Sequence, residues 1–313
     1  MDAIAAPFHA GLARGPDGGT AHWVMATDGV RLRIVHWPGG LRGTVLIFPG
    51  RTEPAEKYGP TAAELVSGGF ACLAIDWRGQ GLSDRAFADP MVGHVGDFAE
   101  YQRDVDAMLD LVATLGSPGP YYVLAHSMGG AIALRTLIRL PGQFRAAAFS
   151  APMWGIRMSP AMRPVARIVG MAAGWFGQSH RYAPTTTGTA YLVTQPFQGN
   201  VLTHDPYMYA WMRDQVVEAP GLQLGGPSIG WLTAAMRECA ALAALPSPGL
   251  PVICALGTAE AVVDPVPIHA RMAQWGTGQL DLYPGAAHEV PMEVPAVRRR
   301  FHQRAITLFQ GAR

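Results

Sequence analysis

The sequence predicts an α/β protein with a mostly parallel sheet, helices on both faces of that sheet and a helical insertion between its two halves. The first observation is a series of continuous apolar runs, which are typical of strands buried on both faces. They occupy residues 43–50, 70–76, 121–126 and 144–152. The second is that helix-like segments alternate with these runs, as in a parallel sheet. The third is that this alternation stops at residue 152 and resumes only at residues 250–257 and 278–285.

The chain before the first apolar run predicts a hairpin over residues 22–37, with the letters TDG as its turn. In the second half of this segment, Leu32 and Ile34 alternate with Arg31 and Arg33, which is the period of a strand with one buried face. We therefore expect an antiparallel pair ahead of the parallel strands.

Four segments predict the main helices of the core. Residues 53–69 look helical and end at a pair of glycines. Residues 128–140 follow the third apolar run, and residues 294–309 close the chain. Residues 97–115 form the clearest amphipathic pattern. Its apolar face consists of Phe98, Tyr101, Val105, Met108, Leu109 and Val112.

Residues 152–230 differ from the rest of the chain, because they are rich in Met, Trp, Gly and Pro and contain no comparable strand-like run. Helical pieces are recognisable at residues 159–176 and 205–220. The simplest arrangement is a core formed by residues 1–151 and 231–313, with residues 152–230 inserted as a lid. Active sites of such folds gather beyond the carboxyl ends of the strands, so we expect the lid to cover the site.

Composition and charge limit the class of protein. Apolar residues make up 49% of the 313 residues and charged residues 15%, which suits a large core and argues against disorder. The net charge of +1 gives no reason to expect nucleic-acid binding. The three cysteines lack metal-ligand spacing, so we expect buried, reduced thiols and no metal site.

The N-terminal segment lacks the basic start and the continuous apolar stretch of a secretory signal. The long uncharged stretch over residues 239–259 contains three prolines and is too broken for a membrane span. We therefore expect a soluble, cytoplasmic protein.

The third apolar run leads directly into the letters AHSMGG, which makes Ser127 the candidate nucleophile. A nucleophile at a strand-to-helix turn takes a strained backbone, and its neighbours must be small so that strand and helix can cross. Ala125 and Gly129 meet this requirement, and Gly130 adds room. The alternative is an ordinary serine that caps the helix with its hydroxyl.

Serine catalysis also needs a base and an acid that orients it, each at a strand end. His288 follows the last predicted strand and precedes the final helix; the alternative is a surface histidine. Two acids follow residues 250–257. Glu260 is nearer the strand end and is the preferred acid, whereas Asp264 also suits an N-cap ahead of Pro265.

Two backbone amides are expected to stabilise the oxyanion. One is the amide of Met128, which opens a helix whose dipole favours negative charge. The other is the amide of Arg51, in the loop after residues 43–50.

The segments FPGRTEPAEKY, AIDWRGQGLSDR, AHSMGGAIAL, GTAEAVVDP and GAAHEVPME together resemble the monoglyceride lipase and lysophospholipase group of α/β hydrolases. The order serine, acid, histidine is also the order of that fold. The resemblance covers roughly residues 25–310 and implies the α/β-hydrolase fold, with a mostly parallel eight-stranded sheet flanked by helices and a helical lid. The resemblance also implies a catalytic triad of Ser127, Glu260 and His288. It implies that the backbone amides of Arg51 and Met128 form the oxyanion hole.

The sequence departs from the group in three places. The letters PG stand where the group has His-Gly before the oxyanion loop, and Ala125 replaces the first glycine of the serine motif. Glu260 stands where monoglyceride lipases most often have Asp, and its longer side chain can orient a histidine if the backbone is offset. In the segment DWRGQGLSDR, we expect Asp76 and Arg78 to tie loops together.

The leading hypothesis is a serine carboxylester hydrolase for single-chain lipid esters, either monoacylglycerols or lysophospholipids, that uses no metal or organic cofactor. The apolar residues of the lid fit a tunnel for an acyl chain. For any single one of these residues, packing in the lid's own core is the more frequent role. Arginines among the apolar residues 157–176 suggest transient contact with a membrane surface. Nucleic acid is not an expected partner, and the sequence indicates no oligomeric state. The predicted substrate contacts are Met153, Trp154, Trp211 and Trp231.

Other activities share the same triad. A short-chain carboxylesterase, a thioesterase and an aminopeptidase of this fold differ in their lids. A peptidase needs a carboxylate cluster in the lid, where only Asp205, Asp214 and Glu218 are acidic. Epoxide hydrolases and dehalogenases carry Asp at the position of Ser127. A non-catalytic ligand-binding protein of this fold usually lacks part of the triad, whereas every candidate is present here.

Overall fold

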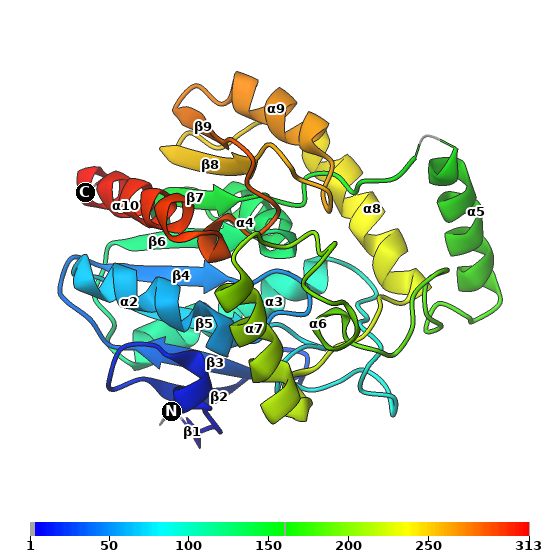
Figure 1. The fold of residues 1–313 in the computed structure, drawn as a ribbon, viewed down its shortest axis with the longest axis horizontal. Coiled ribbons are helices and arrows are strands. Elements are labelled where there is room, and N and C mark those ends of the chain that lie inside the picture. The colour runs from blue at the N-terminus through cyan, green and yellow to red at the C-terminus, as the bar shows by residue number, and fades with distance from the viewer. Residues whose placement is uncertain (1–3, 160, 313) are drawn as a thin grey trace.

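The structure is a computed structural model that describes residues 4–159 and 161–312. Within these residues, nine strands form one mixed sheet in the order β1-β2-β3-β5-β4-β6-β7-β8-β9 (Figure 1). The strands from β4 to β9 pair in parallel, whereas β1, β2 and β3 are antiparallel and join the rest through β5. The strands are β1 (Ile4–Ala5), β2 (Thr20–Met25), β3 (Arg31–Trp37), β4 (Thr44–Phe48), β5 (Ala71–Asp76), β6 (Tyr121–His126), β7 (Phe144–Ser150), β8 (Val252–Gly257) and β9 (Gly278–Tyr283).

The predicted class, a mostly parallel sheet flanked by helices, is confirmed, and the expected hairpin is β2 and β3. The sheet has nine strands rather than the predicted eight. The additional strand is β1, whose residues Ile4 and Ala5 lie opposite Trp23 and His22 of β2. Two residues are too few for a periodic pattern to indicate a strand.

Alternate residues of β4 point into two separate apolar cores, one on each face of the sheet. Val45 and Ile47 belong to the core under α2 and α10, whereas Leu46 and Phe48 belong to the core under α3, α4 and α9. This arrangement explains why the central strands are continuously apolar. The helices are α2 (Gly59–Ser67), α3 (Ala99–Thr114), α4 (Met128–Arg139), α9 (Pro265–Gln274) and α10 (Pro295–Gly311).

The segment predicted as one helix over residues 53–69 is divided into a 3₁₀ turn, η1 (Ala55–Tyr58), and α2. A Cβ atom at Gly59 would lie 1.8 Å from the carbonyl oxygen of Ala13, so the break allows close contact with α1 (Ala10–Ala13). Pro60 is tolerated at this point because the first turn of a helix leaves its amides unpaired.

Between β7 and β8 the chain forms the insertion, in which Figure 1 shows α5 beside α8 at the periphery. In α8, Ala234, Ala235 and Leu242 belong to the core shared with α3 and α4. This helix begins next to residue 230, where we place the end of the lid, and the division into core and lid stays a prediction. The elements are α5 (Met162–Trp175), α6 (Tyr191–Thr194), α7 (Pro206–Glu218), η2 (Pro220–Leu222) and α8 (Ile229–Ala243).

Asp76 and Arg78 tie loops together at the carboxyl edge of the sheet, as predicted. The carboxylate of Asp76 accepts hydrogen bonds from the amides of Ala55 and Leu82, each at 2.8 Å. Arg78 Nε donates to Asp104 at 2.8 Å, which joins the same region to α3. The loops after β4 and β5 are therefore fixed relative to each other where the candidate site lies.

Candidate active site

Ser127 occupies the sharp turn between β6 and α4, with φ of 50° and ψ of −119°. Residues other than glycine rarely adopt this conformation, and such strain is concentrated at functional sites. Its side chain makes no capping hydrogen bond to α4, which removes the alternative of an ordinary helix cap. The Ser127 amide donates to the carbonyl oxygen of Ser150 at 3.1 Å, so the turn is anchored to β7.

The glycines after Ser127 are required by close contacts. A Cβ atom at Gly129 would lie 2.0 Å from the carbonyl oxygen of Phe48, and one at Gly130 would lie 2.4 Å from Cβ of Pro152. The letters AHSMGG thus mark a point where β6 and α4 pass close to the neighbouring strand ends.

The structure brings His288 and Glu260 together. His288 Nδ1 lies 2.8 Å from Glu260 Oε2, and both side chains are buried. The two residues follow β9 and β8, which are the strand ends at which the sequence predicts them. A hydrogen bond at Nδ1 leaves Nε2 as the nitrogen that can exchange a proton with a substrate. Ser127 and His288 line the same cavity.

Three donors keep Glu260 in its charged form. Besides the contact with His288, Oε1 accepts hydrogen bonds from the amides of Val262 at 2.5 Å and Val263 at 3.0 Å. Burial alone would raise the pKa of Glu260, but His288 and the two amides outweigh it and lower the pKa below its ordinary value. A carboxylate that stays charged can hold a histidine in one orientation and stabilise its protonated form.

Asp264, the alternative acid, has a different role. Its carboxylate accepts a hydrogen bond from the amide of Val266 at 3.1 Å, as the N-cap of α9, and pairs with Arg163 at 2.9 Å. Within the described residues, no hydrogen bond or ion pair joins it to His288. The geometry therefore supports Glu260 as the partner of the histidine.

Replacing each of the two acids by alanine should affect kcat differently. Glu260→Ala is expected to lower kcat by about 10³-fold to 10⁴-fold, because His288 loses the group that orients it. Asp264→Ala is expected to lower the free energy of unfolding by about 1 kcal/mol through the lost cap, with kcat near the wild-type value. Steady-state hydrolysis of a p-nitrophenyl ester and thermal unfolding check both variants. A larger loss of kcat in Asp264→Ala than in Glu260→Ala would contradict the assignment.

The backbone amides of Arg51 and Met128 are free to bind an oxyanion. On either side of Arg51, the amides of Gly50 and Thr52 donate to side-chain oxygens at 2.6 Å. Among the described residues, neither Arg51 N–H nor Met128 N–H has an acceptor. Both residues line the cavity that contains Ser127. Free, fixed amides next to a nucleophile are the requirement for an oxyanion hole.

The cavity beside Ser127 has a volume of about 420 Å³ and is mostly apolar. A pocket of this size and character suits a small organic ligand. Elements of the insertion contribute much of its wall. The apolar lining residues include Ile156, Leu192, Leu202, Met212, Leu224 and Trp231.

Two of the four predicted substrate contacts line this cavity, namely Met153 and Trp231. Trp154 and Trp211 are placed elsewhere. Trp154 packs in the core and its Nε1 donates to a carbonyl oxygen of α4 at 3.1 Å, while Trp211 Nε1 donates to a carbonyl oxygen of α1 at 2.9 Å. A buried indole N–H needs a partner, so these two side chains serve the packing of the chain.

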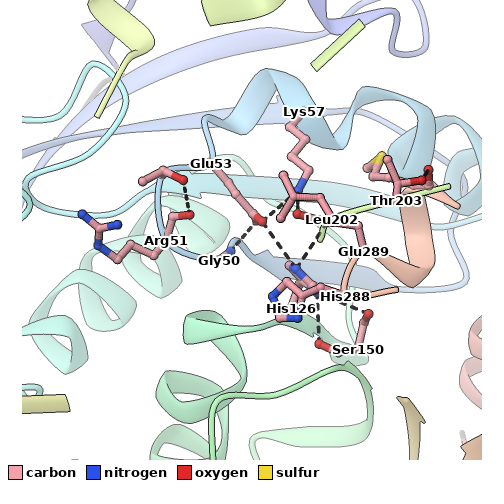
Figure 2. Close-up of polar contacts among 12 residues, drawn as sticks. Gly50, Arg51, Glu53, Lys57, His126, Ser150, Leu202, Thr203, His288 and Glu289 are labelled. Atoms are coloured by element: carbon pink, nitrogen blue, oxygen red, sulfur yellow. Dashed lines mark hydrogen bonds and ion pairs between the residues drawn. The ribbon is translucent and has the colours of Figure 1, made fainter. Parts of the chain in front are cut away.

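The structure also contains a buried charged cluster that sequence reasoning missed, formed by Glu53, Lys57, His126 and Glu289 (Figure 2). We call it the Lys57 cluster. Lys57 Nζ donates to Glu53 at 2.7 Å and to Glu289 at 2.6 Å. His126 Nε2 lies 3.4 Å and 3.3 Å from the same two carboxylates. Lys57 is the only lysine in the sequence, and this was the one sequence feature that could have drawn attention to the cluster.

The Lys57 cluster touches the candidate site on two sides. Glu53 accepts the hydrogen bond of the Gly50 amide, next to the free amide of Arg51. Glu289 directly follows His288, whose ring lies 4.7 Å from the ring of His126. The cluster therefore fixes both the oxyanion loop and the histidine loop.

Glu53, His126 and Glu289 also place possible metal-ligand atoms within 4.8 Å of one another. The ammonium group of Lys57 lies between the two carboxylates, so the cluster contains its own cation. Burial would lower the pKa of His126, but the charges of Glu289 and Glu53 outweigh it and raise the pKa. The charge balance of the cluster does not call for a metal ion.

The sheet order, the strained serine and the histidine–carboxylate pair are together typical of serine hydrolases with the α/β-hydrolase fold. Residues 39–295 match the family described as serine aminopeptidase, S33. The chain belongs to this family.

Curated relatives extend this result. Lysophospholipase L2 of Escherichia coli (strain K12) is 35% identical over 266 residues, which cover 81% of this chain and 76% of that protein. Human monoglyceride lipase is 33% identical over 135 residues, 42% of each chain.

Solved structures show the same fold. A soluble variant of monoglyceride lipase from Saccharomyces cerevisiae superposes with a TM-score of 0.72 at 20% identity, over 92% of this chain and 94% of that chain. A carboxyl esterase from Bacillus coagulans gives a TM-score of 0.74 at 16% identity, over 95% and 99% of the two chains.

Proposed function

We propose that the chain is a serine carboxylester hydrolase that acts on single-chain lipid esters, either monoacylglycerols or lysophospholipids. The observation that carries this proposal is the mostly apolar cavity that contains Ser127, His288 and the two free amides. A cavity with an apolar wall and a few convergent polar groups suits a substrate with one acyl chain and one ester bond.

In the proposed mechanism, His288 Nε2 takes the proton of Ser127 as its oxygen attacks the ester carbonyl. The amides of Arg51 and Met128 hold the oxyanion, and each such donor typically contributes about 3 kcal/mol to the transition state. The alcohol leaves with the proton from His288. Water then hydrolyses the acyl-enzyme on Ser127 by the same path, and Glu260 stabilises the protonated histidine in both halves of the reaction.

The relatives support the substrate class. The two curated relatives named above are a lysophospholipase and a monoglyceride lipase, and both names refer to enzymes for lipids with a single acyl chain. The first covers most of this chain, whereas the second covers less than half of it.

The lid does not provide the carboxylates that an aminopeptidase would need. Asp205 caps α7 and pairs with Arg298 at 2.7 Å. Asp214 and Glu218 are exposed, and none of these three acids lines the cavity. We therefore rank the esterase reaction above the peptidase reaction that the family description names.

A substrate panel tests the proposal. The panel contains 1-palmitoylglycerol, 1-palmitoyl lysophosphatidylcholine, p-nitrophenyl butyrate and leucine p-nitroanilide, with Ser127→Ala as the blank for each. We expect the highest kcat/KM on one of the two palmitoyl lipids. A higher kcat/KM on the butyrate ester or on the anilide would contradict the proposed substrate class.

Contact of the lid with an anionic membrane surface belongs to the same proposal. The helix α5 and the residue after it expose a row of large apolar side chains, which would remain in water without a partner. Arg163 and Arg167 are exposed on the same helix, and no acidic residue occurs between residues 161 and 181. This combination suits an interfacial helix. The row consists of Met162, Val165, Ile168, Met171, Trp175 and Phe176, of which Trp175 is 87% exposed.

Vesicle binding tests this contact. The double variant Ile168→Glu/Trp175→Glu is expected to bind phosphatidylglycerol vesicles at least about 10-fold more weakly, because two apolar side chains lose burial in the interface. Leu41→Glu is the matched control, since Leu41 is 89% exposed on a distant loop. Equal binding of the double variant and the control in a vesicle flotation assay would contradict the role of α5. Helices of the described residues lack the combination of length and apolar character that a membrane crossing requires.

A further inference from the structure

The side chain of Arg51 lies in the wall of the catalytic cavity, on the same residue that offers a free oxyanion amide. Its guanidinium donates from Nη2 to the carbonyl oxygen of Gly225 and lies 5.4 Å from the ring of Trp231. A Cβ atom at Gly93 would lie 2.6 Å from this Nη2 and 3.3 Å from Leu224. Trp231 and Leu224 both line the cavity. The charged end of Arg51 is therefore at the cavity wall rather than in bulk solvent.

Arg51 is the charged lining residue that lacks an opposite charge. Lys57 is paired with both Glu53 and Glu289, and His288 is paired with Glu260. Among the described residues, Arg51 forms no ion pair, and its buried Nε has no hydrogen-bond partner. Burial lowers the pKa of Arg51 to about 10, so the side chain still carries its charge at neutral pH.

A cation that is withdrawn from solvent without an opposite charge is costly for a folded protein. An anionic ligand in the cavity would supply the missing opposite charge. A guanidinium matches the oxygens of a phosphate, which it binds with charge-assisted and often bidentate hydrogen bonds.

We propose that the Arg51 side chain binds the phosphodiester of a lysophospholipid head group and so makes the enzyme select lysophospholipids over monoacylglycerols. This inference rests on the proposed function and names the preferred member of its substrate class. In a lysophospholipid, only the glycerol backbone separates the carboxyl ester from the phosphate. Arg51 offers both kinds of group from one residue: its backbone amide is one of the two proposed oxyanion donors, and its guanidinium lies beside Trp231, which lines the same cavity.

The first experiment compares two substrates with the same acyl group, 1-palmitoyl lysophosphatidylethanolamine and 1-palmitoylglycerol. Its readout is the ratio of their kcat/KM values, because a disturbed oxyanion hole lowers both activities together and leaves the ratio unchanged. Arg51→Gln is expected to lower the lysophospholipid-to-monoacylglycerol ratio by about 10-fold to 100-fold, the usual effect of losing hydrogen bonds to a charged group. Arg51→Lys keeps a positive charge but lacks the paired N–H donors of a guanidinium, so this variant is expected to retain part of the preference for the lysophospholipid.

Arg271→Gln is the matched control. Arg271 also stacks on a tryptophan, Trp154, at 5.7 Å and donates to backbone carbonyl oxygens, but it does not line the catalytic cavity. Its replacement should leave the ratio unchanged. A wild-type ratio in Arg51→Gln, with both activities reduced and a lower melting temperature, would show that Arg51 only braces the loop and would overturn the proposal.

The second experiment measures binding without turnover, so that it stands apart from the proposed function. Ser127→Ala protein is titrated calorimetrically with an ether-linked alkyl lysophosphatidylethanolamine and with the alkylglycerol of the same chain. We expect tighter binding of the phosphate-containing ether, and loss of that preference in Ser127→Ala/Arg51→Gln. Equal affinity for the two ethers in the Ser127→Ala protein overturns the role of Arg51, whatever the activity assays show. A failure of the wild-type enzyme to hydrolyse either lipid would instead contradict the proposed function.

Discussion

Replacement of His288 by alanine is expected to lower kcat on an ester substrate by about 10⁵-fold or more, the effect of removing the base from a serine-hydrolase triad. The fold should survive the change. Glu260 keeps the hydrogen bonds from the amides of Val262 and Val263, so its carboxylate is not left without partners. Stopped-flow or steady-state hydrolysis of p-nitrophenyl butyrate measures the loss of kcat, and circular dichroism shows whether the fold is retained.

His269→Ala is the control for His288→Ala. His269 is exposed on α9 and does not line the cavity, so its removal should change kcat by no more than about 2-fold. If His288→Ala kept more than a tenth of the wild-type kcat, His288 would not be the base.

Replacement of Lys57 by methionine is expected to lower the free energy of unfolding by about 3–5 kcal/mol. Methionine fills a similar volume but leaves the buried carboxylates of Glu53 and Glu289 without their shared cation. Removing one partner of a buried ion pair is costly for this reason. Burial would lower the pKa of Lys57, but the two carboxylates outweigh it and raise the pKa, which agrees with a stabilising contact. Chemical denaturation gives the free energy directly.

Arg237→Met provides the comparison for Lys57→Met. Arg237 and Asp97 form an exposed pair at 3.8 Å, with 63% of each side chain accessible. Such surface pairs contribute about 1 kcal/mol or less. Equal destabilisation by Lys57→Met and Arg237→Met would contradict the importance of the Lys57 cluster.

The sequence predicts much of this fold because the central strands and their helices have regular patterns. Strands buried on both faces read as continuous apolar runs, and β4 shows why, since its neighbouring residues enter two different cores. Features set by single close contacts were not predictable. The break at Gly59 depends on the carbonyl oxygen of Ala13, which is distant in sequence. The strand β1 is too short to have a period.

The candidate site was predictable where its residues directly follow strands of the sheet. Ser127, Glu260 and His288 each follow a strand that the sequence indicates, and the structure places the last two in direct contact. Side-chain direction was not predictable from composition. Trp154 and Trp211 have the apolar character of an acyl tunnel, but their indole N–H groups bind carbonyl oxygens inside the fold.

The Lys57 cluster escaped prediction for a related reason. Its members come from three separate segments, and only the folded chain brings Lys57, His126 and Glu289 together. Charged residues next to a catalytic motif are usually solvated, so their sequence positions do not indicate burial.

The central claim is that Ser127 attacks the substrate and carries the acyl group. The most direct measurement is labelling of the intact protein with a fluorophosphonate probe, followed by peptide mass spectrometry to locate the label. We predict one label per chain, on the peptide that contains Ser127, with no label on Ser127→Ala. Labelling at another residue, or equal labelling of the wild type and Ser127→Ala, would contradict the claim.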